Sequence, residues 1–244
     1  MKIYTALQIG EYHQNYCEDY LFVGEIGSDK VLCAVMDGCT MATDSYFVAT
    51  LVGKLLRKIA KQRIYKEFYD SELANISIEN DLKSIIKELF EELNISKNYL
   101  MLEKKELMTT LILLLINKKK QKGVVLVVGD GLVNINGKIT EFDQENTPDY
   151  LGFHLDKDFE NWYNSQKQKI FFEEIHDLSI ATDGIFMFSE NKKDLTDSID
   201  PIHFLLIDKN HEENEEMLSL KLKKLEMQFG IKPTDDLALI RIIC

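Results

Sequence analysis

Proline, paired cysteines and long apolar runs are all scarce in this 244-residue chain. Only three prolines occur, and neither a Gly/Ser-rich stretch nor a repeat of solenoid period is visible, so nothing marks a boundary between independent domains. The 45% hydrophobic content suffices for a buried core in a chain of this length. We therefore expect a single domain covering residues 1–244.

The four cysteines include no Cys-x-x-Cys pair, which argues against a structural zinc site and a disulfide framework. The N-terminal residues contain no apolar stretch of signal-peptide length, and the longest apolar run, Leu107 to Ile116, is too short to span a bilayer. We therefore predict a cytoplasmic protein with no membrane partner.

Positive charge is also in short supply. The formal net charge of -12 argues against a nucleic-acid partner, because phosphate backbones are bound through clustered Lys and Arg. The one basic run, Lys118 to Lys122, lies between two apolar segments, with Asn117 before it and Gly123 after it. This pattern predicts a hairpin turn kept soluble by its charge.

Acidic residues, in contrast, recur at the ends of apolar runs that we interpret as buried strands. The five signals are Glu18-Asp19, Asp37-Gly38, Gly129-Asp130, Asp183-Gly184 and Asp235-Asp236. Each alone has an ordinary explanation, since Asp-Gly is common in turns and Glu-Asp pairs are usual on surfaces. Their recurrence favours convergence in the fold. Converging carboxylates without interleaved Lys or Arg are costly unless a hard cation such as Mg²⁺ or Mn²⁺ lies among them, so the sequence predicts a metal site.

The periodicity of the chain predicts an α+β fold. Three segments have apolar residues at helical spacing: one that begins after Asp44, one at 82–93, and one at 218–225 that ends near Gly230. Short strands are expected at 2–8, 19–24, 31–36, 108–116, 123–129, 132–135, 138–142, 169–175, 177–182 and 236–242. Many short strands interrupted by long amphipathic helices indicate stacked antiparallel sheets with helices over their outer faces.

The stretch from about 145 to 169 has no clear period. Long loops of this kind are often functional, so one interpretation is a flap over the site. The other is a surface loop anchored by its aromatic residues, such as Trp162 and Tyr163.

In order along nearly the whole chain, these motifs resemble the metal-dependent serine/threonine protein phosphatases of type 2C, in a divergent bacterial branch. The matching motifs are Gly10-x-x-His13-x-x-x-Cys17-Glu18-Asp19, Asp37-Gly38, Met108-Thr109-Thr110, Gly129-Asp130, Ala181-Thr182-Asp183-Gly184 and Asp235-Asp236-Leu237-Ala238-Leu239-Ile240. The resemblance implies an α-β-β-α sandwich, in which two stacked antiparallel β-sheets are flanked by helices on both outer faces. It also implies a binuclear Mn²⁺/Mg²⁺ site at one edge of the sandwich.

The resemblance further implies a role for each matching position. Asp37 would bridge two ions, the Gly38 carbonyl and Glu18 would bind one of them, and Asp183 and Asp235 would bind the other. Asp19 and Asp236 would support these ligands from behind. Asp130 matches the position at which bacterial relatives recruit a third ion.

Several positions depart from the family pattern, among them Tyr46 and the glycine-poor stretch 39–43. Gln14 stands where an Arg usually clamps the substrate phosphate, and a neutral amide cannot replace a bidentate cation. The neighbouring His13 has two interpretations: it binds the phosphate when protonated, or it orients Glu18 or Asp19. Cys39 replaces a His proposed as general acid, and Met187 replaces an acidic residue that some relatives use for the third ion.

The resemblance implies a hydrolase that acts on phosphoserine or phosphothreonine of a phosphorylated protein through a metal-activated water. That mechanism agrees with the lack of a Ser-His-Asp elbow or a Cys-based phosphatase loop. The missing Arg motivates one alternative, a catalytically weak or inactive phosphatase-like module that binds a phosphoprotein or regulatory partner. Another alternative, a two-metal nuclease or nucleotide hydrolase, would need a basic groove or a phosphate-cradling Gly loop, and neither is visible.

Overall fold

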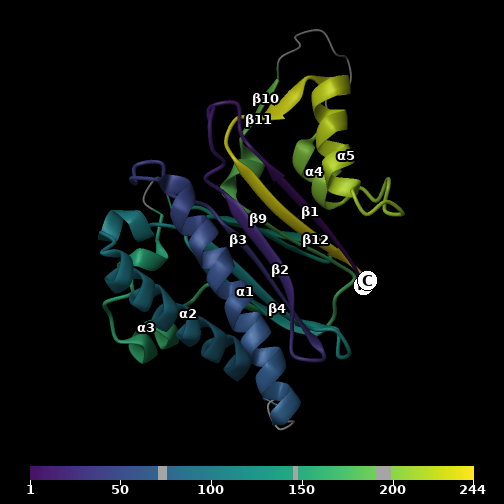
Figure 1. Cartoon of the computed structure of the whole chain (residues 1–244). Helices are drawn as coiled ribbons and strands as arrows, with labels where there is room; N and C mark the ends of the chain where they lie inside the picture. Colours follow the sequence, from purple (N-terminus) through teal and green to yellow (C-terminus); the bar gives the residue numbers. More distant parts are fainter. Residues whose placement is uncertain (71–75, 145–147, 191–198) are drawn as a thin grey trace.

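The computed structural model describes residues 1–70, 76–144, 148–190 and 199–244, and its central feature is a pair of stacked five-stranded sheets (Figure 1). All neighbouring strands are antiparallel. The first sheet has the order β1 (Lys2–Gln8), β12 (Leu237–Ile243), β9 (Asp177–Ala181), β6 (Gly131–Ile135) and β7 (Lys138–Phe142). The second has the order β2 (Tyr20–Ile26), β3 (Lys30–Met36), β4 (Leu111–Asn117), β5 (Lys122–Val128) and β8 (Lys169–Phe172).

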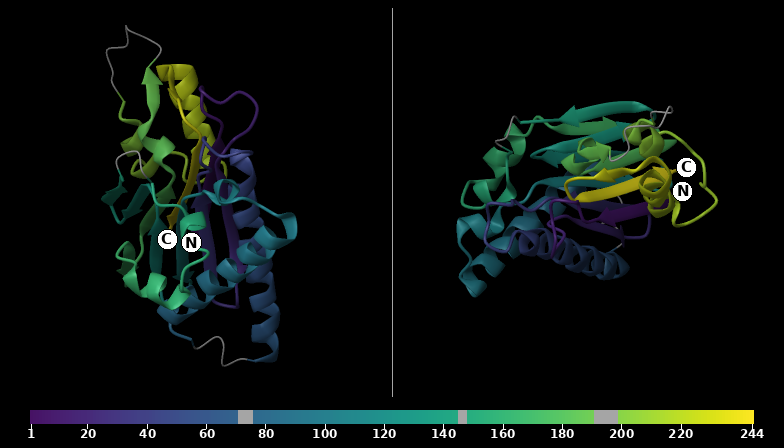
Figure 2. Two further views of the ribbon diagram at one scale, coloured as in Figure 1. Left: turned by 90° about the vertical axis from the view of Figure 1, so that its left-hand side faces the viewer. Right: turned by 90° about the horizontal axis from the view of Figure 1, so that it is seen from above.

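Helices cover the outer face of each sheet, as the view from above shows (Figure 2). The long helices α1 (Ser45–Tyr69) and α2 (Ile78–Leu100) pack on the second sheet, and α4 (Pro201–Leu206) and α5 (Met217–Lys224) pack on the first. A π-helical turn, Leu225–Phe229, extends α5 and ends at Gly230. The smaller elements are α3 (Phe159–Ser165), a two-stranded sheet of β10 (Phe188–Glu190) and β11 (Ile231–Pro233), and the 3-10 turns Lys104–Leu107, Leu151–Phe153 and Asp183–Phe186.

The core consists of three apolar layers, because alternate residues of a strand face opposite sides of its sheet. In β3, Leu32 and Met36 face the layer beneath α1 and α2, whereas Cys33 and Val35 face the other sheet. All seven residues of β3 are buried, since both faces of the strand are covered. This arrangement confirms the predicted α+β sandwich with helices on both outer faces.

All ten predicted strands are present, although several of their ends differ. The fourth begins at Leu111 instead of 108, because Thr109 forms an isolated bridge with Gly38 before the strand starts. The eighth ends at Phe172 instead of 175. The basic run forms the predicted turn between β4 and β5. The helices α3 and α4 and the strands β10 and β11 were missed.

Residues 148–169 lie close to both α2 and the second sheet, while residues 145–147 of the same predicted segment fall outside the described residues. The Trp162 side chain is 4% exposed, and its ring centroid lies 4.5 Å from that of Phe90 in α2. The backbone N–H of Leu151 donates to the Thr109 carbonyl at 3.0 Å. Aromatic packing on α2 and this hydrogen bond therefore anchor the described part of the segment beside Thr109, which forms the isolated bridge with Gly38.

No helix within the described ranges is long and apolar enough to cross a membrane.

Candidate functional site

Two of the acidic motifs meet at one end of the second sheet. Tyr20 pairs with Met36 across β2 and β3, which places Asp19 and Asp37 next to each other at the strand ends. Thr110 fixes the backbone of Asp37 from the neighbouring strand: its N–H donates to the Asp37 carbonyl at 2.9 Å, and its Oγ1 accepts from the Asp37 N–H at 3.1 Å. Asp37 is therefore held at the end of a buried strand by two backbone contacts.

Two further motifs meet at the corresponding end of the first sheet. β9 and β12 are antiparallel neighbours, so Asp183, just after β9, lies beside Asp235 and Asp236, just before β12. Gly184 allows this close approach, because a Cβ on it would lie 1.9 Å from the Asp236 carbonyl oxygen. The stacked sheets thus bring both pairs of motifs together at the same edge of the sandwich.

The electrostatics of these carboxyl groups show that they act on one another. Burial raises the pKa of Asp37 well above its usual range, and the charges of Asp19, Asp183 and Asp235 raise it further. Burial likewise raises the pKa of Asp19, where the charges of Asp183 and Asp236 add to the effect. Like charges in a desolvated space disfavour ionisation of each other. Motifs from four separate parts of the chain therefore form one repulsive cluster.

Asp183 belongs to the same cluster and connects it to Asp130. Burial raises the pKa of Asp183 to about 6, and the charges of Asp235 and Asp130 contribute. Burial, hydrogen bonds and other carboxylates are the largest causes of these shifts, and no Lys or Arg of the described residues is among these causes. Paired buried carboxylates normally have such a cation beside them.

Glu18 is held at the edge of the cluster by both its backbone and its side chain. Its carbonyl accepts from the Gly38 N–H at 3.2 Å. Its carboxylate accepts hydrogen bonds from Ser45 Oγ at 2.5 Å and from Thr40 Oγ1 at 2.9 Å. The first residue of α1 and the loop after Gly38 therefore orient the Glu18 side chain.

Asp236 ties three separate parts of the N-terminal region to this edge. Its Oδ1 accepts from the Gly10 N–H at 2.7 Å, and its Oδ2 accepts from the Glu18 N–H at 2.5 Å. The Nδ1 atom of His13 lies 2.8 Å from the same Oδ2 and 3.8 Å from Asp235 Oδ1. These contacts match an orienting role for His13, although it supports Asp235 and Asp236 instead of the expected Glu18 or Asp19.

Residues at the end of the first sheet hold the Asp19 side chain through a hydrogen bond. Its Oδ2 accepts from Thr182 Oγ1 at 2.6 Å, and the same hydroxyl accepts from the Ala238 N–H at 2.9 Å. The chain Asp19–Thr182–Ala238 crosses from one sheet to the other, so it holds the two halves of the carboxylate cluster in register.

Asp130 sits between two glycines with positive φ, Gly129 at 89° and Gly131 at 142°. This backbone turns the Asp130 side chain toward a pocket that Asp183 and Met187 also line. The Oδ1 atom of Asp130 is buried and, among the described residues, has no hydrogen-bond partner. Burial raises the pKa of this carboxyl group, and the Asp143 charge raises it further.

The donor set fits a hard divalent cation by its chemistry. It consists of carboxylate oxygens, it includes an unsatisfied buried oxygen on Asp130, and no amine or guanidinium of the described residues is among the main groups that act on it. Within the described ranges, however, no three His, Cys, Asp or Glu side chains already surround one point as the ligands of a single ion.

Three residues with hydroxyl groups support the site but were not among the site residues predicted from the sequence. Ser45, Thr40 and Thr182 orient acidic side chains through their hydroxyl groups. Thr182 directly precedes Asp183, so its position in the motif was a usable clue. Ser45 and Thr40 lie 27 and 22 residues from Glu18, and only the fold brings them to it.

A comparison with known protein families decides the classification. The sequence model described as protein phosphatase 2C matches residues 10–224, which is most of the chain. The chain belongs to the protein phosphatase 2C family. This family comprises serine/threonine phosphatases and is generally metal-dependent. No curated protein sequence matches the chain.

Solved structures of bacterial phosphatases share this protein phosphatase 2C fold. A bacterial serine phosphatase that carries a point mutation is 15% identical, with a TM-score of 0.64 and coverage of 100% of this chain and 98% of that one. Stp1, a serine/threonine phosphatase from Staphylococcus aureus, is 14% identical, with a TM-score of 0.60 and coverage of 100% and 95%. RsbX in complex with magnesium is 17% identical, with a TM-score of 0.53 and coverage of 98% and 92%.

Proposed function

We propose that this chain is a Mn²⁺- or Mg²⁺-dependent phosphatase that hydrolyses phosphoserine or phosphothreonine in another protein, and that residues 1–244 form one phosphatase domain. The observation that carries the proposal is the mutually repelling cluster of Asp19, Asp37, Asp183 and Asp235, in which Asp19 is buried and the other three side chains are partly exposed. A cluster of this kind destabilises a metal-free protein, so its presence in a protein phosphatase 2C chain is best explained by cation binding.

The proposed ligands are those that the family resemblance implies. Asp37 would serve two ions, Glu18 and the Gly38 carbonyl would serve one of them, and Asp183 and Asp235 would serve the other. Asp130 would contribute to a third, weaker site through its unpartnered oxygen. When bound, divalent cations supply activation of a water nucleophile and neutralisation of charge on the phosphoryl group.

The protein's own residues position these groups. Thr110 and Thr109 fix the Asp37 backbone, Thr182 fixes Asp19, and Ser45 fixes Glu18. Such prepared orientation lowers the reorganisation needed during the reaction. Asp236 would act through its contacts with Glu18 and His13, as a positioning residue.

The direct test is the rate of hydrolysis of an aryl phosphate and of a phosphopeptide with added Mn²⁺. We expect Asp37→Asn to reduce both rates to the level seen without protein, because it removes the proposed bridging carboxylate. Asp156→Asn is a matched control with the same change of charge on an exposed side chain. An unchanged rate in Asp37→Asn would remove Asp37 from the mechanism.

Titration calorimetry with Mn²⁺ separates the enzyme from the alternative of a non-catalytic module. The enzyme should take up Mn²⁺ and release heat that Asp37→Asn abolishes, whereas the module should bind little or none. This second test is needed because Gln14, which is exposed, stands at the position where the family usually has an Arg that binds the substrate phosphate.

A further inference from the structure

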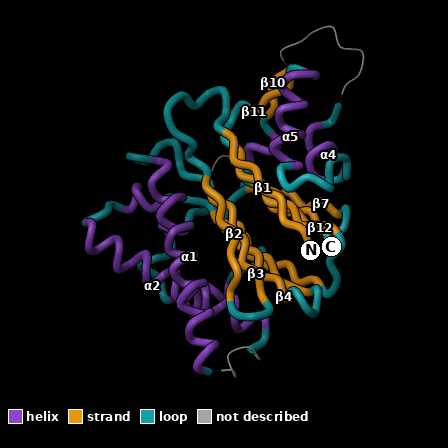
Figure 3. The backbone as a smooth tube through the Cα atoms, turned by 45° about the vertical axis from the view of Figure 1, so that its right-hand side comes forward, coloured by secondary structure: helices purple, strands orange, loops and turns teal. Residues whose placement is uncertain are grey.

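A pocket open to solvent lies beside Glu18, between the start of α1 and the loop joining β1 to β2 (the teal segment between these strands in Figure 3). Three tyrosines line it: Tyr12, Tyr16 and Tyr46. The rings of Tyr16 and Tyr46 are stacked, with centroids 4.5 Å apart and planes 21° apart. We call the stacked rings of Tyr16 and Tyr46 the aromatic platform, and it lies directly beside the proposed active site.

This platform remains accessible. Tyr12 is 75% exposed and Tyr16 is 61% exposed, so neither side chain is needed to fill the core. Exposed aromatic side chains of this kind are enriched where proteins bind partners. Tyr46 is half-buried at the beginning of α1, which fixes the position of the platform relative to Ser45 and Glu18.

The charges of the pocket are of one sign. Asp44 and Glu18 line it, and no Lys or Arg does within the part of the chain that the structure describes. Asp44 occupies the N-cap position of α1, yet its side chain makes no capping hydrogen bond. His13 also lines the pocket and is its one basic side chain among the described residues, but its Nδ1 faces Asp236. The lining thus combines aromatic faces with a carboxylate that the helix does not use.

We propose that Tyr16, Tyr46 and Asp44 bind an arginine side chain of the phosphorylated protein, close in sequence to the phosphorylated residue. The inference rests on the proposed phosphatase function and narrows its substrate class. A guanidinium group stacks on tyrosine faces and pairs with a carboxylate, and no Lys or Arg of the described residues lines the pocket to compete for this position.

A second pocket, beside Asp130 and Asp183, is also acidic and aromatic. Among the described residues its lining includes four acidic residues and two phenylalanines but no Lys or Arg: Asp130, Glu141, Asp143, Asp183, Phe142 and Phe186. An acidic substrate would therefore meet repulsion at both pockets that border the proposed metal ligands. Basic substrates would be favoured further by the net charge of -12.

The test uses phosphopeptides that are identical except at one position, which carries Arg, citrulline, Ala or Glu and is moved through the residues around the phosphoserine. At the best position we expect kcat/KM to be about tenfold higher for Arg than for Ala. Citrulline has nearly the shape of Arg without its charge and should behave like Ala, while Glu should give a lower value than Ala. Equilibrium binding of the same labelled peptides, measured by fluorescence anisotropy, reports the preference even without turnover.

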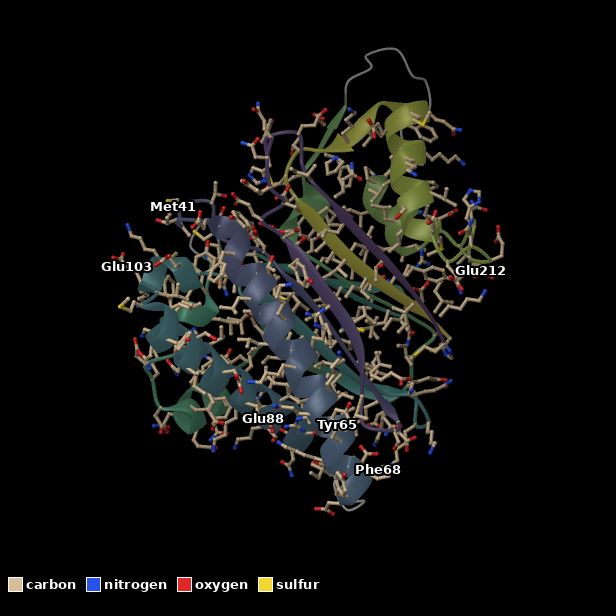
Figure 4. All side chains as sticks on the ribbon, viewed as in Figure 1. Met41, Tyr65, Phe68, Glu88, Glu103 and Glu212 are labelled. Atoms are coloured by element: carbon tan, nitrogen blue, oxygen red, sulfur yellow. The ribbon has the colours of Figure 1, made fainter. Side chains whose placement is uncertain are left out.

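Variants then assign the preference to the platform. Tyr46→Ala should bring the Arg-to-Ala ratio close to one, whereas Tyr46→Phe keeps the ring and should retain the ratio. Asp44→Asn should lower it in part, because the carboxylate is lost while Asn still tolerates the left-handed backbone at φ 55°. Tyr65→Ala is the control: this side chain is 69% exposed on the far half of α1 (Figure 4), and its loss should leave the ratio unchanged.

These measurements separate the arginine site from the phosphatase activity. Hydrolysis of the aryl phosphate with equal kcat/KM and equal Kd for Arg and Ala peptides would overturn the arginine site alone. An Arg preference that survives Tyr46→Ala would overturn the role of the platform. An absence of all hydrolysis with Mn²⁺ would overturn the phosphatase, and the ratio of peptide Kd values would still decide whether arginine is bound.

Discussion

The buried carboxylate of Asp236 accepts a hydrogen bond from the backbone N–H of Glu18 at 2.5 Å. These residues are separated by 218 positions in the chain, so the bond joins the N-terminal loop to the start of the last strand. Glu18 and Asp235 are proposed ligands of different ions. Asp236, the neighbour of Asp235, therefore links the position of Glu18 to that of Asp235.

We predict that Asp236→Ala lowers the free energy of unfolding by about 3 kcal/mol, because it leaves the buried N–H groups of Gly10 and Glu18 without their acceptor. Asp236→Asn should cost less, since one side-chain oxygen remains. Urea unfolding at fixed Mn²⁺ concentration measures both. Mn²⁺ affinity should weaken in the same order, and an Asp236→Ala protein as stable as the wild type would contradict the proposed positioning role.

Gly184 offers a second prediction, on the close approach of two loops. A Cβ at this position would lie 1.9 Å from the Asp236 carbonyl oxygen, so Gly184→Ala must push the loops apart. We expect a loss of about 3 kcal/mol of stability, as in other overpacked sites, together with weaker Mn²⁺ binding.

The matched control is Gly137→Ala. Gly137 has a φ of 87°, but a Cβ there meets nothing within 4 Å, so only the backbone conformation is strained. Its cost should be about 1 kcal/mol, with no change in Mn²⁺ affinity. Equal effects of the two substitutions on Mn²⁺ affinity would show that the contact between Gly184 and Asp236 does not shape the site.

Much of the fold was readable from the sequence because burial on both faces leaves a clear signal. The uninterrupted apolar run 31–36 forms β3, and all of its residues are buried. The short elements left no comparable signal. β10 and β11 have three residues each, and α4 has six, although Asp200 followed by Pro201 is a pattern typical of a helix start.

The candidate site was readable in part for a different reason. Asp37, Asp183 and Asp235 each adjoin a buried strand, and adjacent antiparallel strands bring their ends together. The sequence could not predict which distant residues contact the acidic side chains. The hydroxyl groups of Ser45 and Thr40 lie next to Glu18 only because of the way α1 and the loop before it are folded. The tyrosine stack was missed for the same reason, since Tyr16 and Tyr46 belong to separate segments.

Arg241 gives a prediction on stability alone. Its fully buried guanidinium donates to Asp177 through Nε at 3.0 Å and Nη2 at 2.6 Å, and it also donates to the carbonyls of Leu205, Ile207 and Asp208. Arg241→Met should cost about 3–5 kcal/mol, because Asp177 would lose its buried partner. Arg241 lies at the opposite end of β12 from Asp235, so Mn²⁺ affinity of the folded protein should not change. Denaturation and calorimetry test the two statements separately.

The last prediction concerns the pH dependence of stability near α5. Burial alone would raise the pKa of Asp208, but the hydrogen bond from Lys221, whose Nζ lies 3.0 Å from Asp208 Oδ1, outweighs it and lowers the pKa. Because the folded-state pKa is depressed, this carboxylate stabilises the fold above its unfolded pKa of about 3.9, and the contribution is lost as pH falls through the folded-state value. Asp208→Asn should therefore be less stable than the wild type at pH 6, and the difference should shrink steadily below pH 4. Urea unfolding across this range measures the difference, with Asp156→Asn as the exposed control; a difference that stays constant down to pH 2 would show that Asp208 stabilises the fold by shape and not by charge.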